Sequence, residues 1–265
     1  MMIRKASRLR CAIALGALLA GFITAPPAAA EPYIRAGGGI DWSQSSTFFD
    51  RDCAARQPPA LFGCVIGEGG VPIGARGDFG SSASIDLGAG FRILPGFRVE
   101  ALATHRPDFG FSGNANFLST PQPQPVSAKL RSTTGMVVGY LDLVELGLPA
   151  IGPLEPFVGA GLGLTRHRLS SVTYGFPGFG PGASTVIQGG SQTTFSYMLT
   201  AGTALRISEQ ATLDIAYRYA DLGTVRSDAG PALITRPAFS TSLDIAGTEA
   251  DLTTHGITAS LRYQF

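Results

Sequence analysis

Apolar and polar residues alternate at every second position in eight separate segments of this sequence. The pattern is clearest in 83–93, where one set is Ile85, Leu87, Ala89, Phe91 and Ile93, and the other set is Ser84, Asp86, Gly88, Gly90 and Arg92. A period of two is typical of a β-strand whose two faces meet different surroundings. The other seven segments are 33–43, 97–104, 130–143, 157–168, 196–207, 213–219 and 257–265. The pattern therefore predicts an all-β chain.

The connections between these segments alternate in length. Residues 94–96 and 208–210 form tight turns and 144–153 is moderately short, whereas 44–81, 107–128, 170–192 and 223–252 are long and rich in Gly, Pro, Ser and Asn. Outer-membrane barrels combine an even number of strands with short periplasmic turns and longer extracellular loops. The predicted fold is an eight-stranded antiparallel transmembrane β-barrel with short periplasmic turns and four long extracellular loops.

The polar face distinguishes a membrane barrel from a soluble barrel of lipocalin type, which would turn its apolar face inward. It carries Arg35, Asp41, Asp86, Arg92, Arg98, Glu100, Asp142, Arg206, Asp214, Arg218 and Arg262. A soluble lumen with so many charges and no apolar core would be poorly stable, because burying ions without partners is costly. Turning the charges inward and the apolar face toward lipid avoids this cost. Residues 130–143 fit less well, since Met136 and Val138 fall on the expected inner face.

The lumen of an eight-stranded barrel is just wide enough for side chains to fill. We expect a charge network to close it, formed by Arg35, Arg92, Arg98, Glu100, Asp142, Arg206, Asp214, Arg218 and Arg262. The chain direction places all of these except Arg218 at similar heights in the periplasmic half. The sequence does not assign partners, because a slip of one residue in register reverses the faces of a strand.

Residues 1–30 have the composition of a cleavable export signal. Arg4, Lys5, Arg8 and Arg10 precede the apolar run 11–25, and residues 28–30 are small alanines. The run is shorter than the roughly 20 residues that a membrane-spanning helix needs. We therefore expect a signal peptide at 1–30 and one barrel domain at 31–265. The domain then has 16 Lys and Arg (20 minus 4) against 19 Asp and Glu, and this balance argues against a nucleic-acid partner.

Cys53 and Cys64 are the only cysteines that follow the signal, and both lie in the first long connection. Export to an oxidising compartment favours a disulfide between them. Closing this loop would add about 3 kcal/mol of stability in the chain-entropy picture. Free thiols or a metal site are the alternatives, but no histidine or third cysteine lies nearby in the sequence.

The histidines His105, His167 and His255 fall near strand ends on the side of the long connections. His167 with Ser170 or Ser171 is the nearest approach to a base and nucleophile, but no third group that would orient the base is evident. The glycines of 159–163 lack the strand-to-helix context and the lysine of a nucleotide loop. We therefore expect no catalytic, cofactor-binding or metal-binding residues.

Leu261, Tyr263 and Phe265 form an outward apolar row at the C-terminus. Ordinary strand alternation accounts for them too, but a final Phe with an aromatic residue two positions earlier favours an insertion signal for the outer membrane.

Three stretches resemble the small OmpA-type outer-membrane barrels, especially the surface-antigen porin-like proteins of Gram-negative bacteria. They are PFVGAGLG at 156–163, LDIAYRYADLG at 213–223 and HGITASLRYQF at 255–265. The resemblance covers the strand segments and leaves out the long connections. It implies an eight-stranded antiparallel barrel whose final strand is read by the barrel-assembly machinery. The chain departs from the pattern by ending at Phe265 without a peptidoglycan-binding domain, so a cell-wall tethering role is not carried over.

The leading functional hypothesis is a non-enzymatic protein of the Gram-negative outer membrane, exported by the general secretory route, with a structural or surface-interaction role. Its expected partners are outer-membrane lipid, lipopolysaccharide and the assembly machinery. The alternatives are a small porin or channel and, third, a lipid A-modifying enzyme at the barrel rim.

Overall fold

The computed structural model describes residues 31–118 and 122–265, so the predicted export signal lies outside the described residues. Eight long strands are β1 (Glu31–Ser43), β4 (Ser81–Leu94), β5 (Phe97–Ala115), β6 (Gln124–Asp142), β7 (Leu154–Leu169), β10 (Gly190–Arg206), β11 (Ala211–Arg226) and β14 (Thr248–Gln264). Six short strands are β2 (Ser45–Asp50), β3 (Ala75–Asp78), β8 (Val172–Gly175), β9 (Ser184–Ile187), β12 (Gly230–Arg236) and β13 (Phe239–Ile245). Two short 3-10 helices, η2 (Glu68–Gly70) and η3 (Pro177–Phe179), complete the elements. No helix within the described ranges is long and apolar enough to span a membrane.

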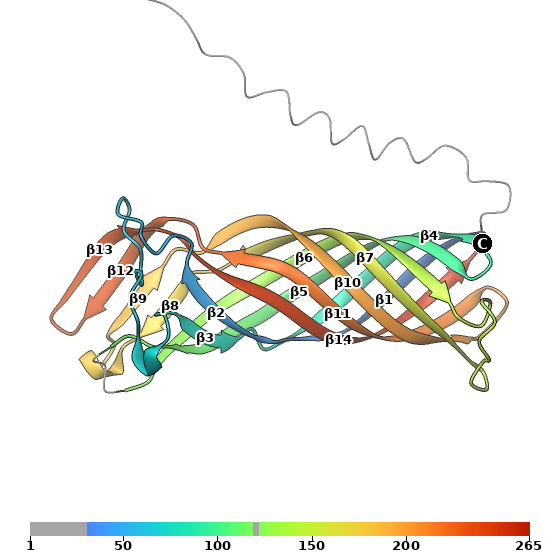
Figure 1. The fold of residues 1–265 in the computed structure, drawn as a ribbon, viewed down its shortest axis with the longest axis horizontal. Helices are drawn as coiled ribbons and strands as arrows, with labels where there is room; N and C mark the ends of the chain where they lie inside the picture. Colours follow the sequence, from blue (N-terminus) through green and yellow to red (C-terminus); the bar gives the residue numbers. More distant parts are fainter. Residues whose placement is uncertain (1–30, 119–121) are drawn as a thin grey trace, which may run out of the picture.

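The eight long strands form a closed ring of antiparallel pairs. Each pairs with the next long strand along the chain, and β1 pairs with β14 to complete the ring. Figure 1 shows these strands winding around the long axis of the molecule. All eight overlap the segments predicted from the alternation, so the all-β antiparallel prediction is confirmed. The expectation of eight strands alone is incomplete, because the described residues form fourteen.

The two ends of the ring differ in their connections. The turn end carries the short connections 95–96, 143–153 and 207–210, together with Glu31 and Phe265. The C-terminus is marked at this end in Figure 1, and the backbone N–H of Phe265 donates to the carbonyl of Pro32 at 3.1 Å. The other end, the loop end, carries the long connections and all six short strands (Figure 1).

The short strands extend the sheet beyond the ring. β2 and β3 bridge from β14 to β5, while β8, β9, β12 and β13 follow one another outward from β6. The connections that were predicted as long loops therefore contain short strands of their own. Their strands are four to seven residues long, and Gly, Pro and Ser within them weaken the alternation that would reveal them.

The long strands reverse the polarity of their two faces toward the loop end. In β6, the inward residues are Met136 and Val138, then Ser132 and Thr134, and then Val126, Ala128 and Leu130. The outward residues change from Leu141 and Val137 to Arg131 and Lys129. In β11, a bulge between Asp221 and Thr224 interrupts the register, and Gly223 takes the left-handed conformation there with φ 76°. Within one ring, the middle is thus apolar outside and polar inside, and the loop end is the opposite.

The interior of the loop end is a hydrophobic core. Its most deeply buried large members are at most 2% exposed: Phe48, Phe79, Phe109, Phe111, Leu130, Tyr174, Ile187, Leu222 and Leu252. The Phe111 ring meets the rings of Phe48 and Phe79 edge-on at centroid distances of 4.9 and 5.1 Å. The interior of the loop end is therefore filled by apolar side chains and not by the charges expected for the lumen.

Candidate functional site: the interior and rim of the ring

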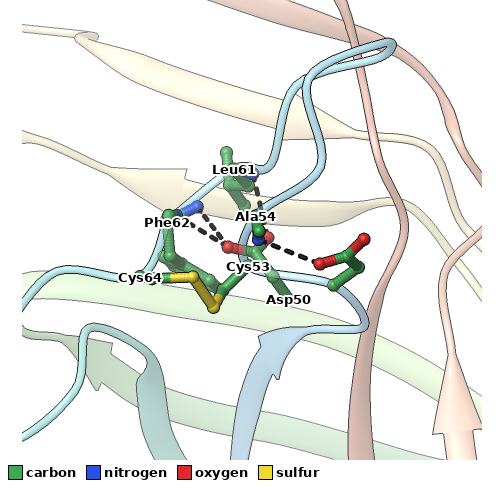
Figure 2. The surroundings of a disulfide bond; sticks show 8 residues. Asp50, Cys53, Ala54, Leu61, Phe62 and Cys64 are labelled. Carbon is green, nitrogen blue, oxygen red and sulfur yellow. Dashed lines mark hydrogen bonds between the residues drawn. A yellow bond between two sulfur atoms is a disulfide. The ribbon is translucent and has the colours of Figure 1, made fainter.

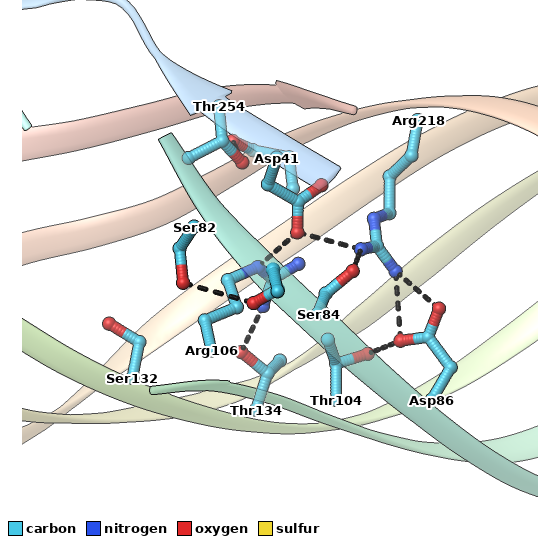
Figure 3. Close-up of polar contacts among 12 residues, drawn as sticks. Asp41, Ser82, Ser84, Asp86, Thr104, Arg106, Ser132, Thr134, Arg218 and Thr254 are labelled. Atoms are coloured by element: carbon cyan, nitrogen blue, oxygen red, sulfur yellow. Dashed lines mark hydrogen bonds and ion pairs between the residues drawn. The ribbon is translucent and has the colours of Figure 1, made fainter. Parts of the chain in front are cut away.

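The centre of the ring holds two carboxylates and two guanidiniums, which we call the central cluster: Asp41, Asp86, Arg106 and Arg218 (Figure 3). The Oδ2 atom of Asp41 accepts from Arg106 Nε at 2.5 Å and from Arg218 Nη2 at 2.7 Å. Arg218 Nη1 donates to both carboxylate oxygens of Asp86 at 3.1 Å. All four residues are at most 3% exposed. Paired charges of equal number avoid the large cost of an isolated buried ion.

Hydroxyl groups connect the central cluster to the rest of the wall. Arg106 Nη1 donates to Thr134 Oγ1 at 3.2 Å, and Thr134 and Thr165 hydroxyls lie 2.9 Å apart. Thr165 Oγ1 then donates to Ser196 Oγ at 3.0 Å. On the other side, Thr104 donates to Asp86 at 2.6 Å. Side-chain bonds thus join seven of the eight ring strands, so this cluster fixes their spacing as well as filling the interior.

A second group, the turn-end cluster, lies closer to the short turns and consists of Arg35, Arg98, Glu100, Asp142, Asp214 and Arg262. It forms three ion pairs: Arg35 with Glu100 at 2.8 Å, Arg98 with Asp142 at 2.7 Å, and Arg262 with Asp214 at 3.2 Å. The Arg98 guanidinium also lies 4.8 Å from the centre of the Tyr140 ring. Rings that stack on guanidiniums supply part of the solvation that water would otherwise provide.

Of the nine predicted network residues, six belong to the turn-end cluster and Arg218 belongs to the central cluster. Arg92 lies at the rim, 25% exposed in its side chain, and forms ion pairs with Glu145 and Glu31. Placing Arg206 on the inner face was wrong. Its side chain is 61% exposed and pairs with Glu155 at 3.3 Å. Arg206 occupies one of the alternate positions of β10 that face inward, but it is the last residue of the strand and lies beyond the enclosed interior of the ring.

Sequence reasoning missed Arg106 because the third segment was taken to end at Thr104. β5 continues to Ala115 through a bulge between Arg106 and Phe109, so Arg106 lies inside and is 2% exposed. The sequence signal that predicts its position is the alternation itself, because Arg106 follows Thr104 by two residues and so falls on the same inner face.

The histidine and serine pairing considered from sequence is absent from this geometry. His167 is buried, with Nδ1 2.8 Å from Ser132 Oγ and Nε2 2.9 Å from the carbonyl of Leu222. Ser170 Oγ instead accepts from the backbone N–H of Lys129 at 2.8 Å. His105 contacts Thr133, and His255 contacts Gln44 and Tyr217. Within the described ranges, no three His, Cys, Asp or Glu residues are grouped as metal ligands would be.

The predicted disulfide between Cys53 and Cys64 is present in the connection from β2 to β3 (Figure 2). Beside it, the Asp50 carboxylate accepts backbone N–H bonds from Leu61, Phe62 and Gly63 at 2.8–2.9 Å. This anchoring places the Phe62 ring 5.9 Å from the ring of Tyr174. Burial raises the pKa of the Tyr174 phenol, and the Asp50 charge acts in the same direction. The disulfide loop therefore covers the hydrophobic core of the loop end.

The outer surface of the ring has an apolar band in its middle. Its exposed members include Ile34, Ile40, Ile85, Leu87, Val137, Leu162, Leu164, Phe195, Leu199, Ile215, Ile257 and Leu261. Such a continuous band on a folded surface marks contact with lipid or protein.

A family model for the outer membrane protein beta-barrel domain matches residues 15–265. The chain belongs to this family. Together with the apolar band, membership places the protein in the outer membrane, where it contacts lipid. The localisation predicted from sequence and the resemblance to small outer-membrane barrels are thereby confirmed.

Similar proteins include candidate adhesins of Rickettsia. The candidate adhesin RT0816 of Rickettsia typhi is 28% identical over 58% of this chain and 66% of its own length. A candidate adhesin of Rickettsia felis is 27% identical over 56% of this chain and 62% of its own length. The chain thus spans less than two thirds of the curated relatives that it matches.

Solved structures that are similar to this chain at low identity include two from Gram-negative bacteria. Neisserial surface protein A is 15% identical, with 88% of this chain and 97% of that chain covered and a TM-score of 0.41. The outer membrane protein OprG from Pseudomonas aeruginosa is also 15% identical, with 89% and 95% covered and a TM-score of 0.47.

Proposed function

We propose that this outer-membrane protein is an eight-stranded transmembrane barrel with a closed lumen and a surface-interaction role, without enzymatic activity. The loop end faces outward and the turn end faces the periplasm. The observation that carries the proposal is the loop end itself: six additional strands, a disulfide and a hydrophobic core lie beyond the apolar band. An ordered projection of this kind suits the presentation of a surface to partners outside the cell.

The interior argues against the porin alternative. The central and turn-end clusters fill the ring with paired charges, and the hydrophobic core of the loop end lies above them. Water-filled conduction requires an open polar path, which larger barrels provide and eight-stranded ones fill with side chains. The role proposed for these clusters is structural, holding the wall strands together from inside.

The domain arrangement and assembly route belong to the same proposal. Residues 1–30 act as the export signal, and residues 31–265 form the barrel. Leu261, Tyr263 and Phe265 are 48%, 38% and 69% exposed on the outer face of the ring, which suits their proposed reading by the barrel-assembly machinery. Lipopolysaccharide is a proposed lipid partner at the outward-facing rim.

Changing Phe265 to Asp is expected to reduce the folded yield in the membrane several-fold, because it places a charge in the apolar row of the last strand. Heat-modifiable mobility on gels measures folded barrel, and Gln264→Asp next to it is the control for added charge alone. Equal folded yields for Phe265→Asp and the wild type would remove the proposed insertion signal.

A recess of about 870 Å³ is a candidate contact surface at the loop end. It lies between the segment 56–59 and the β12–β13 hairpin, and its lining includes Arg56, Leu243 and Asp244. Phe239 and Leu243 on the hairpin are 57% and 50% exposed. The names of the rickettsial relatives, as candidate adhesins, support attachment as the form of this interaction.

Shortening the hairpin tests the surface role. Cells that display the wild-type protein are expected to be retained on cultured animal cells several-fold above cells without it. Replacing 231–244 by a two-residue turn is expected to abolish most of this gain, because it removes one wall of the recess. The control is a Leu233→Ser variant that keeps the hairpin, and heat-modifiable mobility verifies folding of each protein. Equal retention with and without the displayed wild-type protein would reject the surface-interaction role.

A further inference from the structure

Three arginines project outward from neighbouring strands near the loop end: Arg131 on β6, and Arg166 and Arg168 on β7. All three are exposed, while the residues that alternate with them, including Ser132, His167 and Leu169, are buried. The strand register sets Arg131 directly opposite Arg168 and sets Arg166 opposite Thr133. The three therefore form one basic surface, which we call the arginine patch.

The arginine patch begins where the apolar band ends. Leu164 and Leu162 precede Arg166 on the same face of β7 and are 51% and 62% exposed. On the neighbouring strand β10, Phe195 lies opposite Leu164 and is 60% exposed. The apolar band contacts the lipid chains, so the next outward-facing position along the strand lies at the level of the lipid headgroups. The arginine patch is therefore placed at the headgroup layer of the outer leaflet.

The patch is not neutralised by the protein. Among the described residues, none forms an ion pair with Arg131, Arg166 or Arg168. The register shift between Arg106 and Phe109 sets Asp108 opposite Arg131, but the ion pair of Asp108 is with Lys129 at 3.7 Å. Like charges directly opposite each other weaken a sheet, so the Arg131 and Arg168 pair favours an anion between them.

The opposite side of the ring has a different character near this level. The outer faces of β11 and β14 carry Asp221 and Asp251, and Glu249 pairs with Arg226 at 2.8 Å. A general attraction to an anionic surface would not require three arginines without an ion-pair partner to lie side by side on two neighbouring strands. The distribution therefore points to one localised ligand on the β6 and β7 side.

We propose that the arginine patch binds the phosphate groups of a phosphorylated glycolipid of the outer leaflet. The planar fork of a guanidinium matches phosphate oxygens in pairs, and three such groups suit a ligand with more than one phosphate. The apolar residues immediately below, Leu164 and Phe195, meet its acyl chains, which a free phosphate ion does not have. This inference rests on the outward orientation of the loop end in the proposed function.

The test compares two triple variants with the same loss of charge. R131Q/R166Q/R168Q removes the arginine patch, and R51Q/R76Q/R206Q removes three exposed arginines from the disulfide loop, β3 and the end of β10. Purified folded protein in detergent is titrated with bisphosphorylated lipid A, dephosphorylated lipid A and inorganic phosphate, and bound molecules are counted by native mass spectrometry. The patch variant is expected to bind bisphosphorylated lipid A at least about tenfold more weakly than the wild type, since several charge-assisted contacts are lost. The control variant and all binding of dephosphorylated lipid A are expected to change less than about twofold, because neither involves these contacts.

Each other outcome overturns the inference. Equal weakening in both triple variants would show general electrostatic attraction, and no weakening in either would show that lipid A binds elsewhere. Displacement of lipid A by inorganic phosphate at equal concentration would make the free ion the ligand. Insertion into vesicles and heat-modifiable mobility are measured on the same samples. Wild-type protein that fails to insert would refute the proposed barrel itself, whereas inserted protein with unaltered lipid A binding refutes only the arginine patch.

Discussion

Replacing Asp41 by alanine is expected to lower the free energy of unfolding by about 3–5 kcal/mol, the usual cost of removing one partner from a buried ion pair. Asp41 is fully buried and is the shared acceptor of Arg106 and Arg218. After the change Arg218 keeps Asp86, but Arg106 keeps only the Thr134 hydroxyl as a side-chain partner among the described residues. Urea titration of the protein in lipid vesicles, followed by heat-modifiable mobility, measures the loss.

A second variant separates the charge from the packing. Asp41→Ala combined with Arg106→Met removes both partners, and such replacements are often close to neutral. The double variant should therefore be more stable than Asp41→Ala alone. The matched control is Asp251→Ala on the outer face of β14. Among the described residues, its exposed carboxylate accepts only from Thr224 Oγ1 at 3.0 Å, so a change of at most about 1 kcal/mol is expected there. Equal losses for Asp41 and Asp251 would contradict a structural role of the central cluster.

Ion conductance in planar bilayers is a second measurement that tests the role of the central cluster. The wild type is expected to pass little or no steady current, and Asp41→Ala is expected to show intermittent leaks, because water must enter to solvate Arg106. A large, steady current from the wild type that Asp41→Ala leaves unchanged would overturn the closed lumen and favour the porin reading.

The eight wall strands could be predicted from the sequence because their alternation reflects two different solvents. Ile85, Leu87 and Ala89 face outward in β4, and Asp86 and Ser84 face inward, as the period of two requires. The tight turn at 95–96 and the disulfide between Cys53 and Cys64 also follow from local features, namely a Pro-Gly pair and two cysteines in an exported chain.

The loop end could not be predicted in the same way because its polarity is reversed. Outside the lipid, water replaces hydrocarbon around the wall, so Leu130 and Phe111 turn inward and Lys129 turns outward. Toward the loop end the alternation keeps its period of two, but the apolar residues change from the outer to the inner face. In the sequence, this change resembles the end of a strand. The pairing of β2 and β3 with distant strands adds contacts that depend on the whole ring, not on the local sequence.

The ion pairs were beyond sequence reasoning for a related reason. The residues of the network could be chosen by parity, but Arg218 reaches Asp41 across the interior at a separation of 177 residues. Such a contact depends on the stagger of every strand between them. The alternation of faces also does not show where the ring of strands ends, and this is why Arg206 was placed inside.

Replacing Phe111 by alanine is expected to cost about 3–5 kcal/mol, the range found for buried aromatic residues cut back to alanine. The Phe111 side chain is 2% exposed, and its aromatic ring meets those of Phe48 and Phe79 edge-on. Its removal therefore leaves a cavity bounded by two rigid aromatic rings. Because Phe111 lies on β5, which also carries Arg106, the loss of stability should reach the middle of the eight-stranded ring as well as the loop end. Urea titration in vesicles measures the total, and amide hydrogen exchange shows where protection is lost.

The control for this variant is Phe239→Ala, in the exposed β12–β13 hairpin at the same end of the molecule. The Phe239 side chain is 57% exposed, so its removal is expected to change stability by less than about 0.5 kcal/mol. Faster exchange in 109–115 and in the short strand β2, with the turn end unaffected, would show that the loop end unfolds as its own unit. Equal effects of Phe111→Ala and Phe239→Ala would contradict a packed core, and the loop end would then be held by the disulfide and backbone pairing alone. Since the proposed contact surface is built on that core, Phe111→Ala should also lower retention on animal cells, although it lies inside the wall and cannot touch a partner.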